Sequence, residues 1–436
     1  MENKDKQNLK DGTQPGNLFK IIGVGEDGIH TVNRMYGEGI DGVSFAVCDL
    51  NKNLLNCSPV PCRIQLGMEG IGYGNTPKWG HFVTSMHETE LRDMLDDGTQ
   101  MAFVMAGLSE ETGTWAAPEI ARICKHMDFL TVGIVNVPLE CEGSIKSIQA
   151  LKGIKEMARH TDALFLIRNS TISKMHPGLS LIETAVKVEE SLCNIVKSIT
   201  EIVNEKGMID LDFNDVKTAL EDGGMAILCT GEGEGEQALE NALEAAANSP
   251  LLQGNDLFKS KKLLLNISIA GDNASDFLSM EAMGYFNDFM GRFGEDFQMQ
   301  WGLTVNTNQD KPVKATILAT GFELKDMLPD GDFHARALYG LPLDEELLKK
   351  LIEKLSDPTA RGKEIYPWED VLESMKARPE KVFLSDNTCP DCGEKLIQVY
   401  FRSPDWTWKD LCGRAGDMLI CPKCHAQQDF RLTIMN

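Results

Sequence analysis

Short apolar runs alternate with amphipathic stretches over the first 170 residues of the chain. The runs are rich in Val, Ile, Phe and Ala and are bounded by Gly, Pro, Asn or Asp, as buried strands usually are. The stretches between them repeat apolar residues every three or four positions, which is typical of helices that pack one face on a sheet. This alternation predicts an α/β fold with a doubly wound, mainly parallel sheet. Its expected strands are residues 18–25, 42–50, 62–67, 101–107, 129–139 and 162–169.

A long amphipathic helix is predicted next, from about Ile182 to Asn204. Its apolar positions recur every three or four residues, and a helix of about 20 residues spans about 30 Å. We expect this helix to connect the first region to a second α/β region. The strands predicted there are residues 225–233, 262–271, 297–306 and 313–322.

The rest of the chain divides by composition. A charged pattern with helical periodicity follows the second α/β region, and paired cysteines mark the C-terminal residues. The sequence therefore predicts six segments: a disordered N-terminal tail (1–17), a first α/β domain (18–181), the central helix (182–206), a second α/β domain (207–322), a helical extension (323–387) and a small cysteine-bearing module (388–436).

Composition narrows the classes of partner. The formal net charge of −23 and the isoelectric point near 4.8 argue against nucleic acid or an anionic membrane as the main partner. No apolar run approaches the roughly 18 residues of a transmembrane helix, and the polar start lacks the apolar region of a signal peptide. Seven cysteines in the first 230 residues lie mostly inside apolar runs, which indicates buried thiols rather than disulfides. We therefore expect a cytoplasmic protein without a transmembrane segment.

One turn between a strand and a helix has the outline of a phosphate-binding loop. Residues 106–118 read AGLSEETGTWAAP, with a helix predicted from Pro118. Such a turn holds phosphate with free backbone N–H groups and the positive end of the helix dipole. This turn also carries Glu110 and Glu111, which a phosphate would repel.

Five segments in one order resemble the tubulin superfamily, and within it the FtsZ proteins. IIGVGEDGIHTVNRM (21–35) resembles the first phosphate loop, GIGYGNTPKWG (70–80) keeps the glycine spacing of a second loop, and AGLSEETGTWAAP is similar to the signature loop. GMIDLDFNDVKTAL (207–220) resembles the catalytic loop after the long helix, and NSPLL and ATGF match the second domain. One glycine-rich turn is a weak signal, but five segments in register are specific. The resemblance runs from about Leu18 to Phe322 and implies a GTP-binding first domain in a filament-forming protein.

The resemblance also implies that each subunit completes the nucleotide site of its neighbour. The family's two acidic catalytic residues fall on Asp212 and Asp215, which would position or polarise the attacking water together with a cation. The family's Asn two positions before the first acid is Asp210 here. Acidic residues after a helix also commonly cap the next helix, and this alternative stays open.

Nucleotide contacts are implied for small residues of the loops and for polar residues around the base and ribose. Lys146 stands where the family has Arg, Glu189 replaces the guanine-reading Asp, and Ala185 replaces the aromatic residue that stacks on the base. The contacts expected from the resemblance are Gly25, Gly28, Gly72, Gly74, Gly107, Thr112, Gly113, Thr114, Glu142, Lys146, Asn169 and Glu189.

Carboxylates replace several of the family's loop glycines or stand beside them. If both loops keep the family's path, four carboxylates surround the triphosphate: Glu26, Asp27, Glu110 and Glu111. Each like-charge contact at about 4 Å costs about 4 kcal/mol at an effective dielectric near 20, before relaxation. We therefore expect GTP or GDP to bind weakly or not at all, and Mg²⁺ to bind only with a nucleotide. The alternatives are side chains that turn outward, a bridging Mg²⁺, a pocket for a basic side chain of a neighbour, and loop charges without a role.

Two C-P-x-C turns near the C-terminus have the spacing of a zinc ribbon. Four thiolates in paired turns suit a closed tetrahedral Zn²⁺ site with a structural role, and so small a module folds poorly without its metal. We interpret Cys412 and His425 as non-ligands. The expected ligands are Cys389, Cys392, Cys421 and Cys424.

Aromatic and basic residues lie between the two turns, among them Trp406 and Trp408 beside Lys409. They form either the core of the module or a surface on which bases stack. Because the chain is acidic, we expect the ribbon to recruit a protein partner, of unknown identity, rather than nucleic acid.

Three functions remain open on the sequence. The leading one is an FtsZ-like cytoskeletal or scaffold protein with degenerate GTP-binding loops, which assembles with itself or with a true FtsZ. The second is an active GTPase of the division type with an altered phosphate site. The third is a monomeric adaptor whose tubulin-like body carries the ribbon.

Overall fold

The computed structural model divides into two compact units, Met1–Met327 and Leu328–Asn436. The predicted tail, residues 1–17, lies outside the described residues. The residues that the structure describes are 18–40, 42–67, 77–139, 142, 144–205, 207–235, 237–252, 255–271, 280–294, 296–306, 311–323, 345–362, 368–377, 382–389, 395–400 and 417–429.

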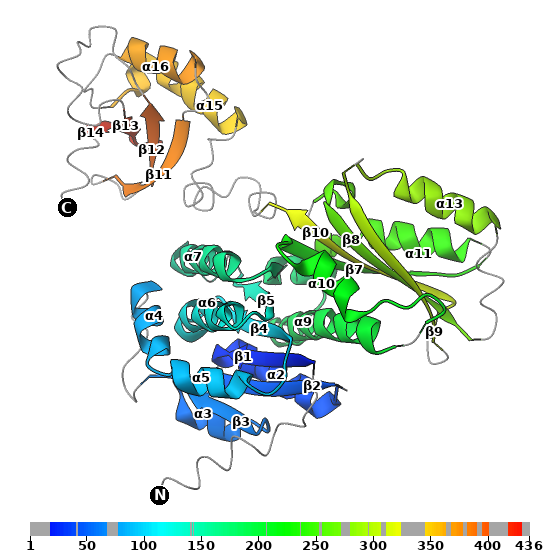
Figure 1. Cartoon of the computed structure of the whole chain (residues 1–436). Helices are drawn as coiled ribbons and strands as arrows, with labels where there is room; N and C mark the ends of the chain where they lie inside the picture. The colour runs from blue at the N-terminus through cyan, green and yellow to red at the C-terminus, as the bar shows by residue number, and fades with distance from the viewer. Residues whose placement is uncertain are drawn as a thin grey trace, which may run out of the picture. The chain divides into compact units, whose positions relative to one another are not determined.

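Ten strands of the first unit form one sheet in the order β3-β2-β1-β4-β5-β6-β7-β10-β8-β9 (Figure 1). All ten strands predicted from the sequence are confirmed, to within two residues at each end. Their bounds are β1 (Phe19–Val24), β2 (Val43–Asp49), β3 (Cys62–Gln65), β4 (Met101–Gly107), β5 (Leu130–Val137), β6 (Ala163–Arg168), β7 (Gly224–Gly233), β8 (Lys262–Ala270), β9 (Gln298–Asn306) and β10 (Val313–Phe322).

The first six strands are parallel and follow the order 3-2-1-4-5-6, so the predicted doubly wound α/β fold is confirmed. The second α/β region continues the same sheet. Strand β7 pairs with β6 in parallel over only three residues, Gly224–Ala226 against Ala163–Phe165. It then pairs with β10, and β10 with β8, in antiparallel fashion. A short seam therefore joins the two halves of the sheet.

Helices cover the strands of the first unit. The predicted long helix is confirmed as α9, which starts after a capping box formed by Ser180 and Glu183. The helix bounds are α2 (Gly25–Glu38), α3 (Lys52–Cys57), α4 (Pro77–Ser85), α5 (Glu88–Leu95), α6 (Glu111–His126), α7 (Ser144–His160), α8 (Asn169–Met175), α9 (Leu181–Asn204), α10 (Phe213–Leu220), α11 (Ala238–Ala247) and α13 (Met280–Met290).

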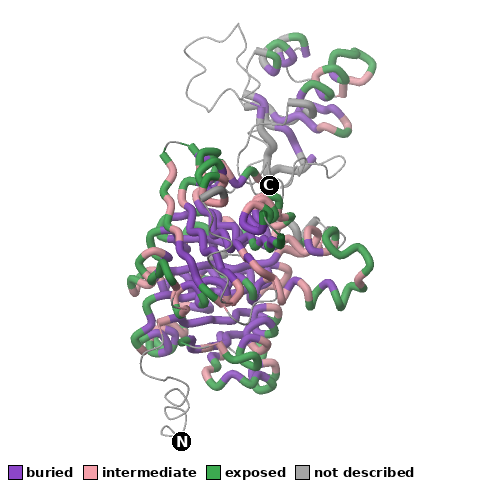
Figure 2. The backbone as a smooth tube through the Cα atoms, turned by 90° about the vertical axis from the view of Figure 1, so that its right-hand side faces the viewer, coloured by how far each residue is buried: buried purple, intermediate pink, exposed green. Residues whose placement is uncertain are grey.

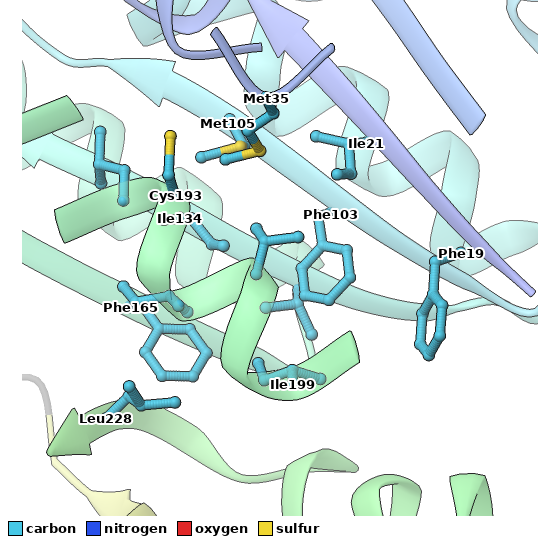
Figure 3. Close-up of a cluster of buried hydrophobic side chains, with 14 of the residues drawn as sticks. Phe19, Ile21, Met35, Phe103, Met105, Ile134, Phe165, Cys193, Ile199 and Leu228 are labelled. Carbon is cyan, nitrogen blue, oxygen red and sulfur yellow. The ribbon is translucent and has the colours of Figure 1, made fainter. Parts of the chain in front are cut away.

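One face of the sheet packs against α2, α9 and α10 in a single hydrophobic core. Figure 3 shows Cys193 and Ile199 of α9 beside Phe103, Met105 and Phe165 of the strands. The central strands are buried on both faces, and buried residues are concentrated in the sheet (Figure 2). This explains why the strands appear in the sequence as continuous apolar runs.

A lysine lies in the buried strand β1. Lys20 is 2% exposed. Its Nζ lies 2.6 Å from Oδ2 of Asp97 and also donates to the carbonyl oxygen of Met94. The ion pair therefore ties the start of β1 to the turn after α5.

Asp97→Asn is expected to lower the free energy of unfolding by about 3 kcal/mol, because losing one partner of a buried ion pair leaves the other charge without its counterion. Urea unfolding near neutral pH measures the change. Asp96→Asn is the matched control, since Asp96 is the exposed neighbour. A loss no larger than that of the control would contradict the prediction.

In its described residues, the second unit combines two helices with a small antiparallel sheet of order β11-β12-β13-β14. Side chains of both helices and three strands form one hydrophobic core around Trp368, Leu355 and Ile397. Among the described residues of the chain, no helix is both long and apolar enough to span a membrane. The bounds are α15 (Glu345–Ser356), η5 (Pro358–Ala360), α16 (Trp368–Ala377), β11 (Val382–Thr388), β12 (Lys395–Tyr400), β13 (Asp417–Ile420) and β14 (Gln427–Asp429).

Candidate functional site

The sheet topology places a candidate site between β1 and β4. The strand order reverses at this pair, and a doubly wound sheet binds ligands at the carboxyl ends of its strands beside such a reversal. Val24 pairs with Ala106 at these ends. Helix α2 starts directly after β1, and a three-residue turn, 108–110, leads from β4 into α6. The two predicted phosphate loops therefore lie side by side.

Glycines allow the two loops to approach each other closely. Gly25 has a φ of +76°, and a Cβ there would lie 2.6 Å from Oε1 of Glu110. A Cβ on Gly113 would overlap the carbonyl oxygen of Gly107. Gly28 is also buried, and a Cβ there would overlap the carbonyl oxygen of Met105 in β4. The expected loop glycines are thus brought together, whereas Gly72 and Gly74 lie outside the described residues.

Glu110 extends from one loop to the other. It is the N-cap residue of α6, but its side chain does not cap that helix. Instead, Oε1 accepts a hydrogen bond of 3.1 Å from the backbone N–H of Asp27, in the first turn of α2. The pKa of Glu110 is raised to about 8, mainly because the carboxyl is buried. The bond from the N–H of Asp27 acts against this rise, and the neighbouring carboxylates of Asp27, Asp49 and Glu26 add to it. The carboxyl is therefore mostly neutral at pH 7.

The other three loop carboxyls behave differently. Asp27 is half-buried, and burial raises its pKa although it interacts with Asn136 and accepts a 3.4 Å bond from Oγ of Ser109. Glu26 is exposed, 3.9 Å from the ring of His30. Glu111 is the half-buried first residue of α6. Asp27 and Glu110 therefore turn into the space between the loops, whereas Glu26 is exposed. That four carboxylates surround a triphosphate stays a prediction.

Helix α6 starts at Glu111 rather than at the predicted Pro118, which lies inside it. The expected phosphate contacts Thr112 and Thr114 are consequently residues of the helix. Thr114 is fully buried, and its hydroxyl donates a 2.5 Å bond to the carbonyl oxygen of Glu110. The Thr114 side chain thus bonds the loop backbone.

Polar residues from three elements lie around the expected base and ribose position. Asn136 at the end of β5 donates a bond of 3.5 Å from Nδ2 to Oδ1 of Asn169, the first residue of α8. Asn136 is 5% exposed, and its Oδ1 has no hydrogen-bond partner among the described residues. Glu189 on α9 is half-buried, and burial raises its pKa, with His30 lowering it. The sequence analysis did not include Asn136 among the expected site residues. The available signal was its place, since an Asn at the carboxyl end of a parallel strand lies where such sheets bind ligands.

The remaining expected contacts are exposed. Glu142 accepts a 2.8 Å bond from the N–H of Leu139 and pairs with Lys146 at 3.0 Å. Ala185 on α9 is exposed and offers no ring to a base. The structure therefore joins Asn169 to the loop residues through Asn136, while Glu142 and Lys146 bind each other.

The two expected catalytic carboxylates cap α10. Asp212 accepts bonds from the N–H groups of Asn214 and Asp215 at 2.7 and 3.1 Å, and Asp215 accepts one from the N–H of Asp212 at 2.9 Å. Phe213 packs edge-on against Phe19, the first residue of β1, with ring centroids 6.3 Å apart.

This capping box lies near the amino ends of the parallel strands, whereas the loops lie at their carboxyl ends. The loops follow the last residue of β1, whereas Phe213 contacts the first. Six residues of strand separate the two ends by about 20 Å. Asp212 and Asp215 therefore cannot act on a ligand held by the loops of their own chain.

Comparison with known proteins agrees with this arrangement. The sequence profile described as the Tubulin/FtsZ family GTPase domain matches residues 19–177, and the FtsZ family C-terminal domain matches residues 224–323. The chain is 40% identical over 311 residues to the Cell division protein FtsZ of Porphyromonas gingivalis, an alignment that covers 70% of this chain and 67% of that protein. The chain belongs to the tubulin/FtsZ family.

Further similarities support the family assignment. The Cell division protein FtsZ of Aquifex aeolicus is 34% identical over 308 residues, covering 70% of this tubulin/FtsZ chain and 83% of that protein. The solved structure titled FtsZ dimer, empty, from M. jannaschii superposes with a TM-score of 0.62 at 28% identity. The superposition covers 73% of this chain and 92% of the M. jannaschii chain.

A cysteine cluster lies beyond both segments that match the tubulin/FtsZ family. The sulfurs of Cys389, Cys421 and Cys424 lie within 4.8 Å of one another, and those of Cys389 and Cys424 are 3.6 Å apart. Two thiolates on one tetrahedral zinc, each at about 2.3 Å, lie about 3.8 Å apart. The N–H of Cys424 donates a 3.3 Å bond to Sγ of Cys421, and hydrogen bonds of this kind orient the ligands of a metal. Cys392 lies outside the described residues.

His425 is turned away from the cluster. Its Nδ1 lies 2.7 Å from the carbonyl oxygen of Ala360, and the N–H of Gly362 donates to the carbonyl oxygen of His425 at 3.2 Å. His425 is not in the group of sulfurs, in line with its interpretation as a non-ligand. The residues after α15 are thereby bonded to the second cysteine turn. Cys412 lies outside the described residues.

Proposed function

We propose that this chain is a cytoplasmic cell-division protein of the FtsZ type that assembles head to tail, with itself or with an FtsZ partner. The main support is that the loops and the Asp212–Asp215 pair lie at opposite ends of the strands of one sheet. The Asp pair can therefore complete a nucleotide site only if it meets the loops of a second subunit. The name of the Porphyromonas gingivalis relative supports division as the process.

In this proposal the nucleotide site is degenerate. Support comes from Glu110 and Asp27, which turn into the space between the loops, and from Ala185 at the position of the stacking aromatic residue. GTP then binds weakly, Mg²⁺ binds only with it, and this chain alone hydrolyses GTP poorly.

The second candidate is a working GTPase. The neutral state of Glu110 at pH 7 favours it, because a neutral carboxyl repels phosphate less than the sequence suggested.

Asp212→Asn is expected to lower the GTPase rate of a mixture with an authentic FtsZ by about tenfold or more relative to the wild-type mixture, because Asn retains the helix cap but loses the charge that orients water. Sedimentation and phosphate release measure polymer mass and rate on the same sample. The control is Asp288→Asn, an exposed carboxylate on α13.

Sedimentation also separates the alternatives. Polymer mass that does not change on mixing, with no pelleting of this chain alone, contradicts assembly and leaves the monomeric adaptor. Micromolar GTP binding with steady hydrolysis by this chain alone contradicts the degenerate site and supports the working GTPase.

We further propose that Cys389, Cys421 and Cys424, with Cys392 as the fourth ligand, hold a structural Zn²⁺. The sulfur separation and the N–H bond to Cys421 support this assignment. The metal would fix the ends of two strands while the ribbon recruits a protein partner. Comparing the proteins that co-purify with the full chain and with a chain ending at Glu323 tests the recruiting role. Identical sets would contradict it.

A further inference from the structure

Helix α2 starts without a cap from its own neighbours in the chain. Its N-cap residue, Val24, has no side chain that accepts a hydrogen bond. The first N–H groups of a helix need acceptors, and an anion is the favoured partner because of the helix dipole. A bound phosphate satisfies this need in many nucleotide-binding proteins.

Glu110 supplies an acceptor from the other loop. Its Oε1 is 3.1 Å from the N–H of Asp27. The same oxygen lies close to Gly25, since a Cβ on Gly25 would be only 2.6 Å from it. That Cβ would also be 2.8 Å from the backbone nitrogen of Gly113, in the first turn of α6. The Glu110 side chain therefore fills the place where both helix N-termini converge.

The side chain of Glu110 makes no capping hydrogen bond to its own helix, α6. Glu110 is the N-cap residue of α6 and has extended backbone angles, φ −125° and ψ 162°. A Glu at this position is long enough to cross to α2, whereas Asp at an N-cap bonds its own helix.

We propose that Glu110 is an internal ligand that takes the place of a nucleotide phosphate at the N-terminus of α2. It holds the two loops together without nucleotide and must leave before a phosphate can enter. This inference rests on the proposed degenerate nucleotide site and names the residue that closes it.

Hydrogen exchange tests the contact without any nucleotide. In the full chain, Glu110→Ala should speed exchange of the first turn of α2 by about tenfold, the effect of one lost hydrogen bond. Glu110→Gln keeps an acceptor of the same reach and should leave exchange unchanged. Glu110→Asp keeps a carboxyl group but loses the reach, and should behave as the Ala variant does. The control is Glu111→Gln. If exchange instead depends on the carboxyl group, so that Asp behaves like wild type and Gln like Ala, the proposal is overturned.

Calorimetry with GTP and Mg²⁺ tests the exclusion of phosphate. Glu110→Ala should bind GTP about tenfold more tightly than wild type, while Glu110→Gln should show no gain. An equal gain in both variants would mean that charge, not occupancy, excludes phosphate, and would overturn the inference. Micromolar binding by the wild type would instead overturn the degenerate site, while the exchange experiment still decides what Glu110 does.

Discussion

Removal of zinc is expected to unfold the second unit, Leu328–Asn436, while the first unit keeps its structure. Structural Zn²⁺ contributes about 10–16 kcal/mol in small thiolate modules, more than a unit of this size can replace. Because the second cysteine turn is bonded to residues after α15, and both helices share a core with the sheet, the loss should reach α15 and α16. Hydrogen exchange of the full chain with a strong chelator measures both units together.

Matched variants separate zinc from general thiol effects. Cys421→Ser should abolish one equivalent of bound zinc and reproduce the effect of the chelator. Cys57→Ser should do neither, since Cys57 is exposed on α3. Protection of α15 and α16 that persists in a zinc-free sample, verified by elemental analysis, would contradict the structural role.

The second large effect is a pH-dependent gain in stability in Glu110→Gln. The pKa of Glu110 is about 8 in the folded chain, against 4.5 for the group without its surroundings. The folded state thus binds the proton more tightly, and stability is lost as pH rises from about 4.5 through 8. Gln carries no proton to lose. The variant should therefore gain about 3–5 kcal/mol relative to wild type between pH 5 and pH 9.

Urea unfolding of wild type and variant at pH 5, 7 and 9 measures this difference. Asp27 and Glu189, whose pKa values are also raised by burial, are present in both chains and largely cancel. Glu111→Gln serves as the charge-matched control and should show no such trend. A constant offset between variant and wild type across this range would contradict the prediction.

The strands could be predicted because burial on both faces leaves an unbroken apolar run, and the period of α9 marks its buried face. The start of α6 could not. Pro118 is a common signal for the first turn of a helix. The sequence alone does not reveal that Glu111–Ala117 already belong to the helix, which packs against α2 and α7. Tertiary packing outweighed the local signal.

The structure places both predicted loops between a strand and a helix, but the direction of each side chain was not predictable. Glu26 and Asp27 are adjacent in sequence, yet one is exposed and the other turns over Gly107. Such choices depend on neighbours that come from other elements, as with Lys20 and Asp97. The cysteine spacing did indicate which residues lie together, since the sulfurs of Cys389, Cys421 and Cys424 lie within 4.8 Å of one another. That they hold zinc stays a prediction.

The separation of the loops from Asp212 makes the subunit directional. Subunits joined through unlike edges form a row whose two ends differ, and partners arriving at each end meet different chemistry. A chain that offers Asp212 but holds nucleotide poorly can complete the site of the FtsZ it joins, and it gives the next arrival little nucleotide to act on. Within the proposed function, such a subunit would terminate the row from one side. It would add one subunit to the row and then prevent further growth at that end.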